Sequence, residues 1–127
     1  MKIGEIAKKS DLPIKTVRYY ADIGLVTPSG RSDAGYRLYD LEALKQLIFI
    51  RRARSFDFSI DQCRELLALY TNHQRSAADV KKLASAHLEM IQKKQLELQH
   101  LHDELAHLVN ACHGDERPNC PIIDFLG

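Results

Sequence analysis

A long heptad pattern in the second half of the chain is the feature that most constrains the fold. Alternate steps of four and three residues from Val80 to Leu108 define nine positions, of which seven are apolar. These positions are Val80, Ala84, His87, Ile91, Lys94, Leu98, Leu101, Leu105 and Leu108. One helix cannot bury such a stripe alone, so the pattern predicts a helix from Ala77 or Ala78 to about Ala111 that pairs with a partner helix.

The segment after this helix combines two cysteines with an apolar tail. One further step of four from Leu108 lands on Cys112, and His113-Gly114 predicts the end of the helix. A loop then leads to Cys120 and to the tail Pro121-Ile122-Ile123-Asp124-Phe125-Leu126. A tail this apolar needs a surface that covers it.

The first 24 residues have the outline of two short helices around a tight turn. Ile3, Ile6 and Ala7 share one face of the first helix, and Ser10-Asp11-Leu12 forms a polar break. Pro13 suits the first turn of a second helix from about Ile14 to Ile23, which Gly24 would end. Two helices of this length predict a helix-turn-helix, with Val17 and Tyr20 on the buried side.

The next stretch predicts a β-hairpin followed by two helices. Turn residues at Pro28-Ser29-Gly30 and Asp33-Ala34-Gly35 flank the alternating pattern around Tyr36 and Leu38, which is typical of a wing. Asp40 can cap a helix from Leu41 to about Ser55. Ser59 followed by Gln62 is a capping-box pattern that opens one more helix, with Cys63 on its apolar face. We interpret Cys63 as a small buried hydrophobe.

Charge is distributed unevenly along the chain and favours a polyanionic partner for its first half. The net charge is only +1, but residues 1–54 carry five Lys and six Arg against six acidic residues. Phosphate neutralisation supplies most non-specific affinity for DNA. Met1 leads directly into an amphipathic pattern, and no apolar run is long enough to span a bilayer, so we expect a cytoplasmic protein without a membrane partner. No phosphate loop, nucleophile elbow or paired carboxylate set is present, and an enzyme is not expected.

A basic and aromatic cluster supplies the candidate DNA contacts. A recognition helix presents its N-terminal half to the major groove, and a wing adds donors to phosphates. The alternative is a solvated face on a small helical domain. The cluster comprises Lys15, Thr16, Arg18, Tyr19, Tyr20, Arg31, Tyr36, Arg37 and Tyr39.

The second candidate site is the pair Cys112 and Cys120. Gly114 and Pro118 favour a loop that brings the two thiols together, and an odd cysteine count argues against a disulfide framework. Two thiolates do not complete a four-ligand zinc site, but they suit a soft monovalent ion such as Cu(I), Ag(I) or Au(I). From spacing alone, a redox pair, two structural cysteines and a zinc site completed by His113 with His107 or a partner chain all stay open.

Two sets of motifs resemble the MerR family of transcriptional regulators. The N-terminal set is Ile3-Gly4-Glu5-Ile6-Ala7, Thr16-Val17-Arg18-Tyr19-Tyr20, Gly24-Leu25-Val26 and Arg31 through Tyr39. The C-terminal set, Cys112 through Cys120-Pro121-Ile122-Ile123, is similar to the copper-efflux-regulator branch, which responds to Cu(I). The resemblance extends over essentially the whole chain.

This resemblance implies a mainly α fold: a winged helix-turn-helix, a helical connector and a long antiparallel coiled-coil dimerisation helix. We expect the DNA-binding part and connector in residues 1–70, the dimerisation helix in 71–111 and the metal loop and tail in 112–127. The implied protein is a homodimer that binds double-stranded promoter DNA and distorts an over-long spacer when metal binds, so that RNA polymerase can engage.

The resemblance also assigns residues. It makes Cys112 and Cys120 the metal ligands, and Lys15, Arg18, Tyr20, Arg31, Tyr36 and Arg37 match DNA-contacting positions. Ala77 stands where divalent-metal relatives carry a cysteine, which disfavours divalent ions. His113 and Pro118 vary among copper- and gold-responsive relatives, so the preference among the monovalent ions is left open. We further hypothesise that metal binding orders the loop and docks the apolar tail against the dimer.

Overall fold

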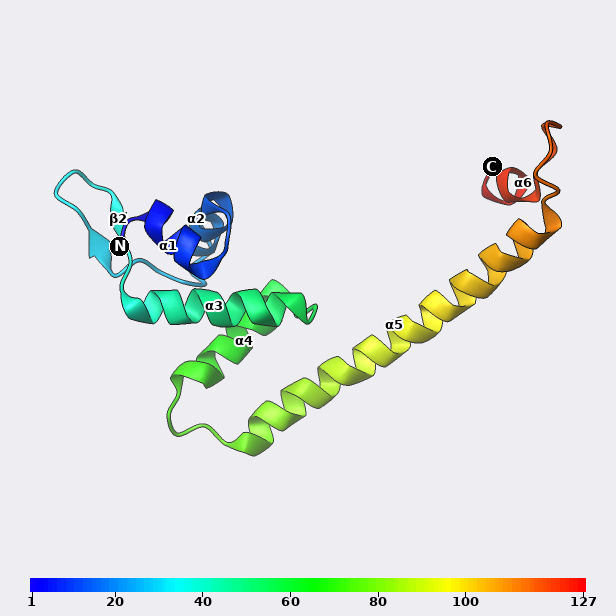
Figure 1. Ribbon diagram of the computed structural model, residues 1–127. Coiled ribbons are helices and arrows are strands. Elements are labelled where there is room, and N and C mark those ends of the chain that lie inside the picture. The colour runs from blue at the N-terminus through cyan, green and yellow to red at the C-terminus, as the bar shows by residue number, and fades with distance from the viewer. The chain divides into compact units, whose positions relative to one another are not determined.

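The computed structural model describes residues 1–127 and is mainly helical (Figure 1). It comprises two compact units, residues 1–80 and residues 81–127, which we describe separately. The elements are α1 (Ile3–Ser10), α2 (Ile14–Asp22), β1 (Gly30–Arg31), β2 (Arg37–Leu38), α3 (Leu41–Ser55), α4 (Ile60–Thr71), α5 (Ala77–Ala111) and α6 (Pro121–Leu126).

Helices α1 and α2 form the predicted helix-turn-helix. Asp11 adopts the left-handed conformation at φ 58° and ends α1, while the N–H of Leu12 donates to the carbonyl of Ala7 at 3.0 Å. Pro13 is the N-cap residue of α2 and lies just outside the first turn, where its fixed φ leads the chain into the helix. Gly24 has φ +70°, which permits the reversal that follows α2.

The wing is a two-stranded antiparallel hairpin, as the turn residues predicted. Gly30 pairs with Leu38 and Arg31 with Arg37. Gly35 supplies a positive φ of 87° at the tip. An isolated bridge between Lys2 and Leu38 joins the segment before α1 to the wing. The wing is therefore attached to the helix-turn-helix by backbone pairing as well as by its own connections.

Local capping explains where α3 and α4 begin. Asp40 Oδ1 accepts from the N–H of Ala43 at 2.8 Å, so the predicted helix from Leu41 to Ser55 is confirmed. Ser59 and Gln62 form the predicted reciprocal capping box, with N–H contacts of 2.8 and 3.1 Å. Asp57, at φ 65°, turns the chain between the two helices.

One hydrophobic core lies inside residues 1–80. It joins α1 to α2, α1 to α3 and α3 to α4. Cys63 is fully buried in this core, as the sequence predicted. The buried apolar residues are Ile6, Ala7, Val17, Tyr20, Leu25, Val26, Tyr39, Ala43, Leu47, Ile50, Ala53, Cys63 and Leu67.

Helix α5 confirms the predicted helix from Ala77 to Ala111. Its leucine stripe is largely open to solvent: Leu98, Leu101 and Leu105 are 64%, 61% and 52% exposed. Leu96 and Val109 add further exposed apolar surface. Contiguous apolar surface of this kind marks a protein interface, in agreement with the partner helix that the heptad pattern requires.

Candidate nucleic-acid interface and metal centre

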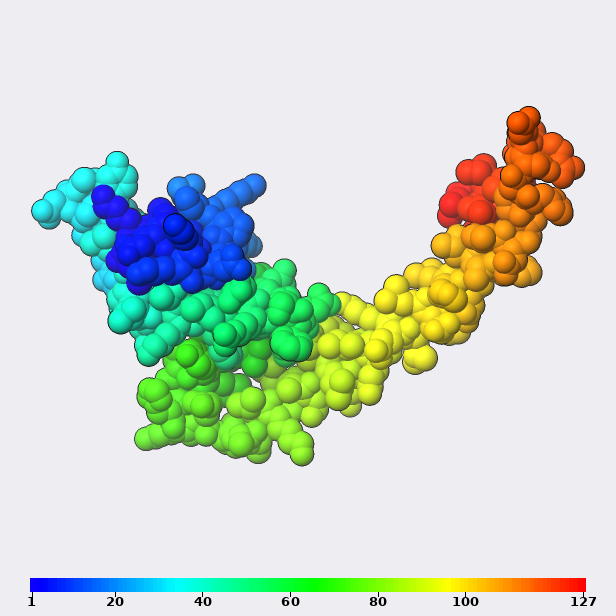
Figure 2. All heavy atoms as spheres, viewed as in Figure 1, coloured from blue at the N-terminus to red at the C-terminus, as the bar shows by residue number.

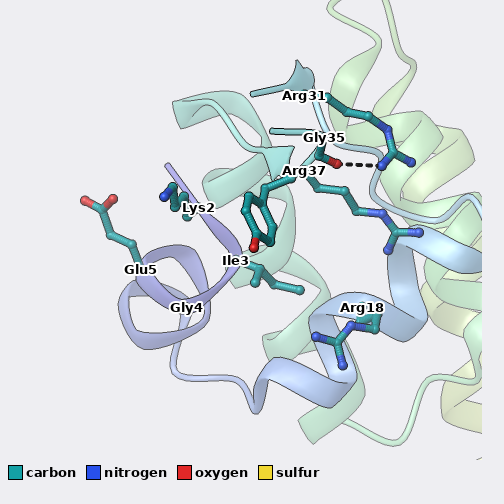
Figure 3. A pocket seen from close by; sticks show the side chains of 9 residues that line it. Lys2, Ile3, Gly4, Glu5, Arg18, Arg31, Gly35 and Arg37 are labelled. Atoms are coloured by element: carbon teal, nitrogen blue, oxygen red, sulfur yellow. Dashed lines mark hydrogen bonds between the residues drawn. The ribbon is translucent and has the colours of Figure 1, made fainter. Parts of the chain in front are cut away.

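A hollow of about 620 Å³ lies between α1, α2 and the wing. Figure 3 shows Arg18 on the recognition helix α2 and the two wing arginines, Arg31 and Arg37, around it. The lining residues are Lys2, Ile3, Gly4, Glu5, Arg18, Arg31, Gly35, Tyr36 and Arg37. Four cationic side chains against the single carboxylate of Glu5 give the hollow an excess of positive charge, which suits a phosphate backbone.

Intramolecular contacts orient the wing arginines. Arg31 Nη1 donates to the carbonyl of Gly35 at 3.0 Å, drawn as the dashed line in Figure 3. Arg37 Nη2 lies 2.8 Å from Asp22 Oδ1, and this hydrogen bond raises the pKa of Arg37. The ammonium of Lys2 lies 5.6 Å from the ring centre of Tyr36, within range of a cation–π contact. These contacts hold the three cations in place around the hollow.

The remaining residues of the predicted contact set fall into two groups. Lys15 and Tyr19 on α2 are exposed, and Thr16 is half-buried. Tyr20 and Tyr39 are only 5% and 2% exposed because their rings fill the core. Burial is the main cause of a raised pKa at Tyr20, which the nearby Arg54 partly offsets. The expected burial of Tyr20 is confirmed, and because both rings pack inside the domain, neither supports the expected contact with DNA.

Cys112 and Cys120 come together, as the loop composition predicted. Their sulfur atoms are 3.6 Å apart, both thiols are free, and both side chains are half-buried. A disulfide would need about 2.05 Å between the sulfurs. Two thiols at this distance can hold one soft metal ion between them or be oxidised to each other.

The loop between the cysteines is folded by its own hydrogen bonds. Asp115 accepts from the backbone N–H of Arg117 at 3.0 Å and from its guanidinium Nε at 2.8 Å. This pairing lowers the pKa of the Asp115 carboxyl. Gly114, at φ +66°, turns the chain directly after Cys112 and His113. These contacts and the turn at Gly114 define the path of the loop between the two cysteines.

Cys120 lies at the start of α6, and its surroundings favour the thiolate. The backbone N–H of Ile123 is the largest cause of a lowered pKa at Cys120, followed by the Cys112 thiol and the N–H of Ile122. The thiolate is both the metal ligand and the nucleophile. Cys63 behaves in the opposite way, because burial raises the pKa of its thiol.

The donor set within one chain consists of these two sulfurs. No group of three or more His, Cys, Asp or Glu side chains converges to hold a metal ion. His113 is exposed, and Ala77 begins α5 without a donor side chain. These two sulfurs would hold a soft monovalent ion, for which thiolates are the selective ligands.

Comparison with known proteins identifies the family. A model described as MerR HTH family regulatory protein matches residues 1–69, and one described as MerR, DNA binding, matches residues 44–108. The chain belongs to the MerR family. None of its helices is both long and apolar enough to cross a membrane.

Members of the MerR family resemble the chain over nearly its full length. The transcriptional regulator HmrR of Rhizobium leguminosarum bv. viciae is 48% identical, covering 99% of this chain and 97% of that protein. CueR of Salmonella typhimurium is 41% identical over 99% of this chain and 91% of its own. The structure of PbrR691 from Ralstonia metallidurans CH34 in complex with lead(II) superimposes with a TM-score of 0.84 at 37% identity, covering 100% and 99% of the two chains.

Helix α6 packs beside the C-terminal part of α5 in this MerR-family chain (Figure 2). A small apolar cavity of about 210 Å³ remains between them, lined by Leu101, Glu104, Leu105, Leu108, Ile122, Phe125 and Leu126. Ile123, Phe125 and Leu126 are still 66%, 57% and 74% exposed. The tail is therefore only partly covered by its own chain.

Sequence reasoning missed the contribution of the N-terminal segment to the basic hollow. Lys2, Gly4 and Glu5 line it because the bridge between Lys2 and Leu38 carries that segment to the wing. Backbone pairing between residues 36 positions apart produces no periodic pattern in the sequence, so it could not be predicted from hydrophobic periodicity. Only the positive charge of Lys2 pointed toward a role in anion binding.

Proposed function

We propose that this chain is a metal-responsive transcriptional regulator that binds promoter DNA as a homodimer and activates metal-resistance or efflux genes on binding Cu(I), or Ag(I) or Au(I), through Cys112 and Cys120. The observation that carries the proposal is the pair of free sulfurs 3.6 Å apart at the end of α5. Membership of the MerR family supports a DNA-binding role for the part of the chain that precedes this pair.

The number and type of ligands favour a monovalent ion. The relatives include CueR, HmrR and a regulator solved with lead(II), so kinship alone does not select the ion. Two thiolates without a third convergent ligand leave a divalent ion under-coordinated, whereas soft thiolates select Cu(I). Ala77 supplies no donor at the start of α5 from either copy of a dimer.

The DNA partner is supported by the basic hollow and the recognition helix. We assign Lys15, Thr16, Arg18 and Tyr19 on α2, and Arg31, Tyr36 and Arg37 on the wing, to promoter contact. The exposed leucine stripe of α5 supports the homodimer. In this assignment residues 1–70 bind DNA, residues 71–111 dimerise and residues 112–127 form the metal loop and tail.

In the proposed mechanism, metal binding controls whether the dimer deforms the promoter DNA. Each end of the dimer holds one half of a promoter whose spacer is too long for RNA polymerase to engage both of its elements. The thiolates of Cys112 and Cys120 would hold the ion, and the apolar tail that follows Cys120 would change its packing in response. The dimer state thus favoured bends and untwists the spacer.

A redox or electrophile sensor on the same scaffold is the second candidate. The 3.6 Å between the sulfurs and the lowered pKa of Cys120 favour it, because oxidation needs a thiolate beside a second thiol. The two functions predict different inducers of the same promoter.

In-vitro transcription from the protein's own promoter separates the two. The wild type is titrated with Cu(I), Ag(I), Au(I), Zn(II) and Hg(II) under reducing conditions, and with peroxide in the absence of metal. We expect induction by the monovalent ions, its loss in Cys112→Ser and Cys120→Ser, and its retention in Cys63→Ser. Induction by Zn(II) alone overturns the ion assignment, and induction by peroxide without metal supports the redox sensor.

A further inference from the structure

The C-terminal end of the recognition helix is held by an arginine from a distant helix. Arg64 on α4 donates from Nη2 to the carbonyl of Ile23 at 3.0 Å and from Nη1 to the carbonyl of Gly24 at 3.3 Å. These partners are 41 and 40 residues away in sequence. The contact therefore joins two elements that only the fold brings together.

The chemistry at this end of α2 explains the fit. A helix C-terminus presents carbonyls that lack intrahelical partners and carries a partial negative charge. The last turn of α2 contains no basic residue of its own. The N–H groups of Leu25 and Val26 both turn back to the carbonyl of Tyr20, at 2.9 and 3.2 Å. Arg64 supplies the positive charge, and the two Nη atoms of its planar guanidinium donate to the carbonyls of Ile23 and Gly24.

The packing of the domain gives this contact a positioning role. The main packing runs from α2 to α1, from α1 to α3 and from α3 to α4. Helices α2 and α4 lie at opposite ends of that series, and Arg64 links them directly. Arg64 is not among the residues that line the basic hollow, so any effect of Arg64 on the hollow would be transmitted through α2.

We propose that Arg64 is a positioning residue for promoter recognition: it fixes the C-terminal end of the recognition helix α2 to the connector helix α4. The role in recognition rests on the promoter binding proposed above. The contact itself is a property of the free protein, so it can be tested without DNA and without metal.

The first measurement is amide hydrogen exchange in the metal-free, DNA-free full chain. We compare the wild type with Arg64→Ala, Arg64→Lys and the control Arg75→Ala. The side chain of Arg75 donates to the carbonyl of Asn72, three residues away, so Arg75→Ala removes one positive charge without removing a long-range hydrogen bond. We expect Arg64→Ala to speed exchange at Leu25 and Val26 but not at Leu47 and Ile50 in the core of α3. Unchanged exchange at Leu25 and Val26 overturns the positioning role.

The second measurement is DNA binding by the same variants across a range of salt concentrations. We expect Arg64→Ala to bind the promoter about three- to tenfold more weakly, since one to two charge-assisted hydrogen bonds at a partly solvated site are lost. Its binding to unrelated DNA and the slope of log affinity against log salt should match those of the wild type. Arg64→Lys should recover part of the loss, because an ammonium retains the charge at the helix end.

Each contrary result counts against the proposal. Promoter affinity of Arg64→Ala equal to that of Arg75→Ala overturns the role in recognition. A reduced salt slope, with an equal loss on unrelated DNA, makes Arg64 a phosphate contact instead. Failure of the wild type to bind its own promoter overturns the proposed function, while the exchange experiment still decides whether Arg64 holds α2.

Discussion

The three cysteines lie in two different environments: Cys63 is buried in the core, whereas Cys112 and Cys120 are half-buried at the C-terminal loop. Cys63 is fully buried, its Sγ lies 3.9 Å from the carbonyl of Phe58, and burial raises its pKa. Cys120 lies at the start of α6, where backbone N–H groups and the Cys112 thiol lower its pKa. Thiol reactivity follows thiolate population and access, so the residues should differ sharply in chemistry.

Alkylation of the native, metal-free protein at pH 7 should reveal this difference. We expect iodoacetamide to modify Cys120 first and Cys112 next, while Cys63 reacts only after unfolding. Because the pKa of Cys120 is lowered, its thiolate should persist to lower pH than that of an ordinary cysteine. Mass spectrometry of timed samples measures the order. Modification of Cys63 before Cys120 in the folded protein would contradict these assignments.

Arg18 provides a test of the basic hollow at the level of one side chain. It lines the hollow from α2 and is exposed. Arg18→Ala should weaken promoter binding by about 1–3 kcal/mol if Arg18 reads a base. If it contacts phosphate, the salt slope should fall by about one for each copy of the chain. Mobility-shift titrations over a range of salt measure both, with Lys81→Ala on α5 as the charge-matched control. Full affinity in Arg18→Ala would exclude the hollow as the interface.

At the scale of elements, the short helix α6 connects the thiol site to the apolar surface of α5. Its first residue follows Cys120, and its end lines a small cavity with Leu101, Leu105 and Leu108. A six-residue helix is not stable by itself. Its packing therefore depends on what it contacts, which makes it suited to respond to a small change at Cys120.

Removing the apolar end of α6 should separate metal binding from activation. Phe125→Ser with Leu126→Ser leaves Pro121 to Asp124, and hence the N–H groups near Cys120, unchanged. We expect Cu(I) affinity within about threefold of the wild type, a change smaller than typical coupling energies of ~1–3 kcal/mol, together with loss of metal-dependent transcription. Asp124→Ser is the control. Normal induction by the double variant would refute the docking of the tail.

At the scale of the whole molecule, the exposed leucine stripe of α5 requires a partner helix that covers it. Leu98 and Leu105 lie on the heptad positions and are 64% and 52% exposed. Charged residues at coiled-coil core positions leave buried, unpaired charges in the interface. Leu98→Glu with Leu105→Glu should therefore convert a dimer into a monomer in sedimentation velocity and abolish promoter binding. Gln92→Glu with Gln95→Glu, off the stripe, should remain dimeric. A wild-type monomer that still binds the promoter would contradict the proposed assembly.

Local sequence signals predicted most of the helical fold because the interactions behind them are local. The Asp40 cap and the Ser59–Gln62 capping box each involve residues three positions apart, and both occur as expected. The apolar tail was expected, but its helix was not, because six residues carry too little periodicity to define one. Tyr20 was expected on the buried side of its helix and also, with Tyr39, among the DNA contacts, because an amphipathic tyrosine suits a core and a DNA interface equally well.

The sequence by itself determined helices α1 to α5, the wing, the need for a partner along α5 and the presence of two cysteines on one loop. These follow from periodicity, caps, turn residues and composition, which act over a few residues. Only the tertiary structure decided that the sulfurs lie 3.6 Å apart, that Lys2 reaches the wing and that Arg64 holds the end of α2. The bridge of Lys2 and the contact of Arg64 join residues about 40 positions apart, and the sulfur distance depends on how the whole loop folds. Such contacts are specified by the packing of the domain and leave no local pattern from which they could be read.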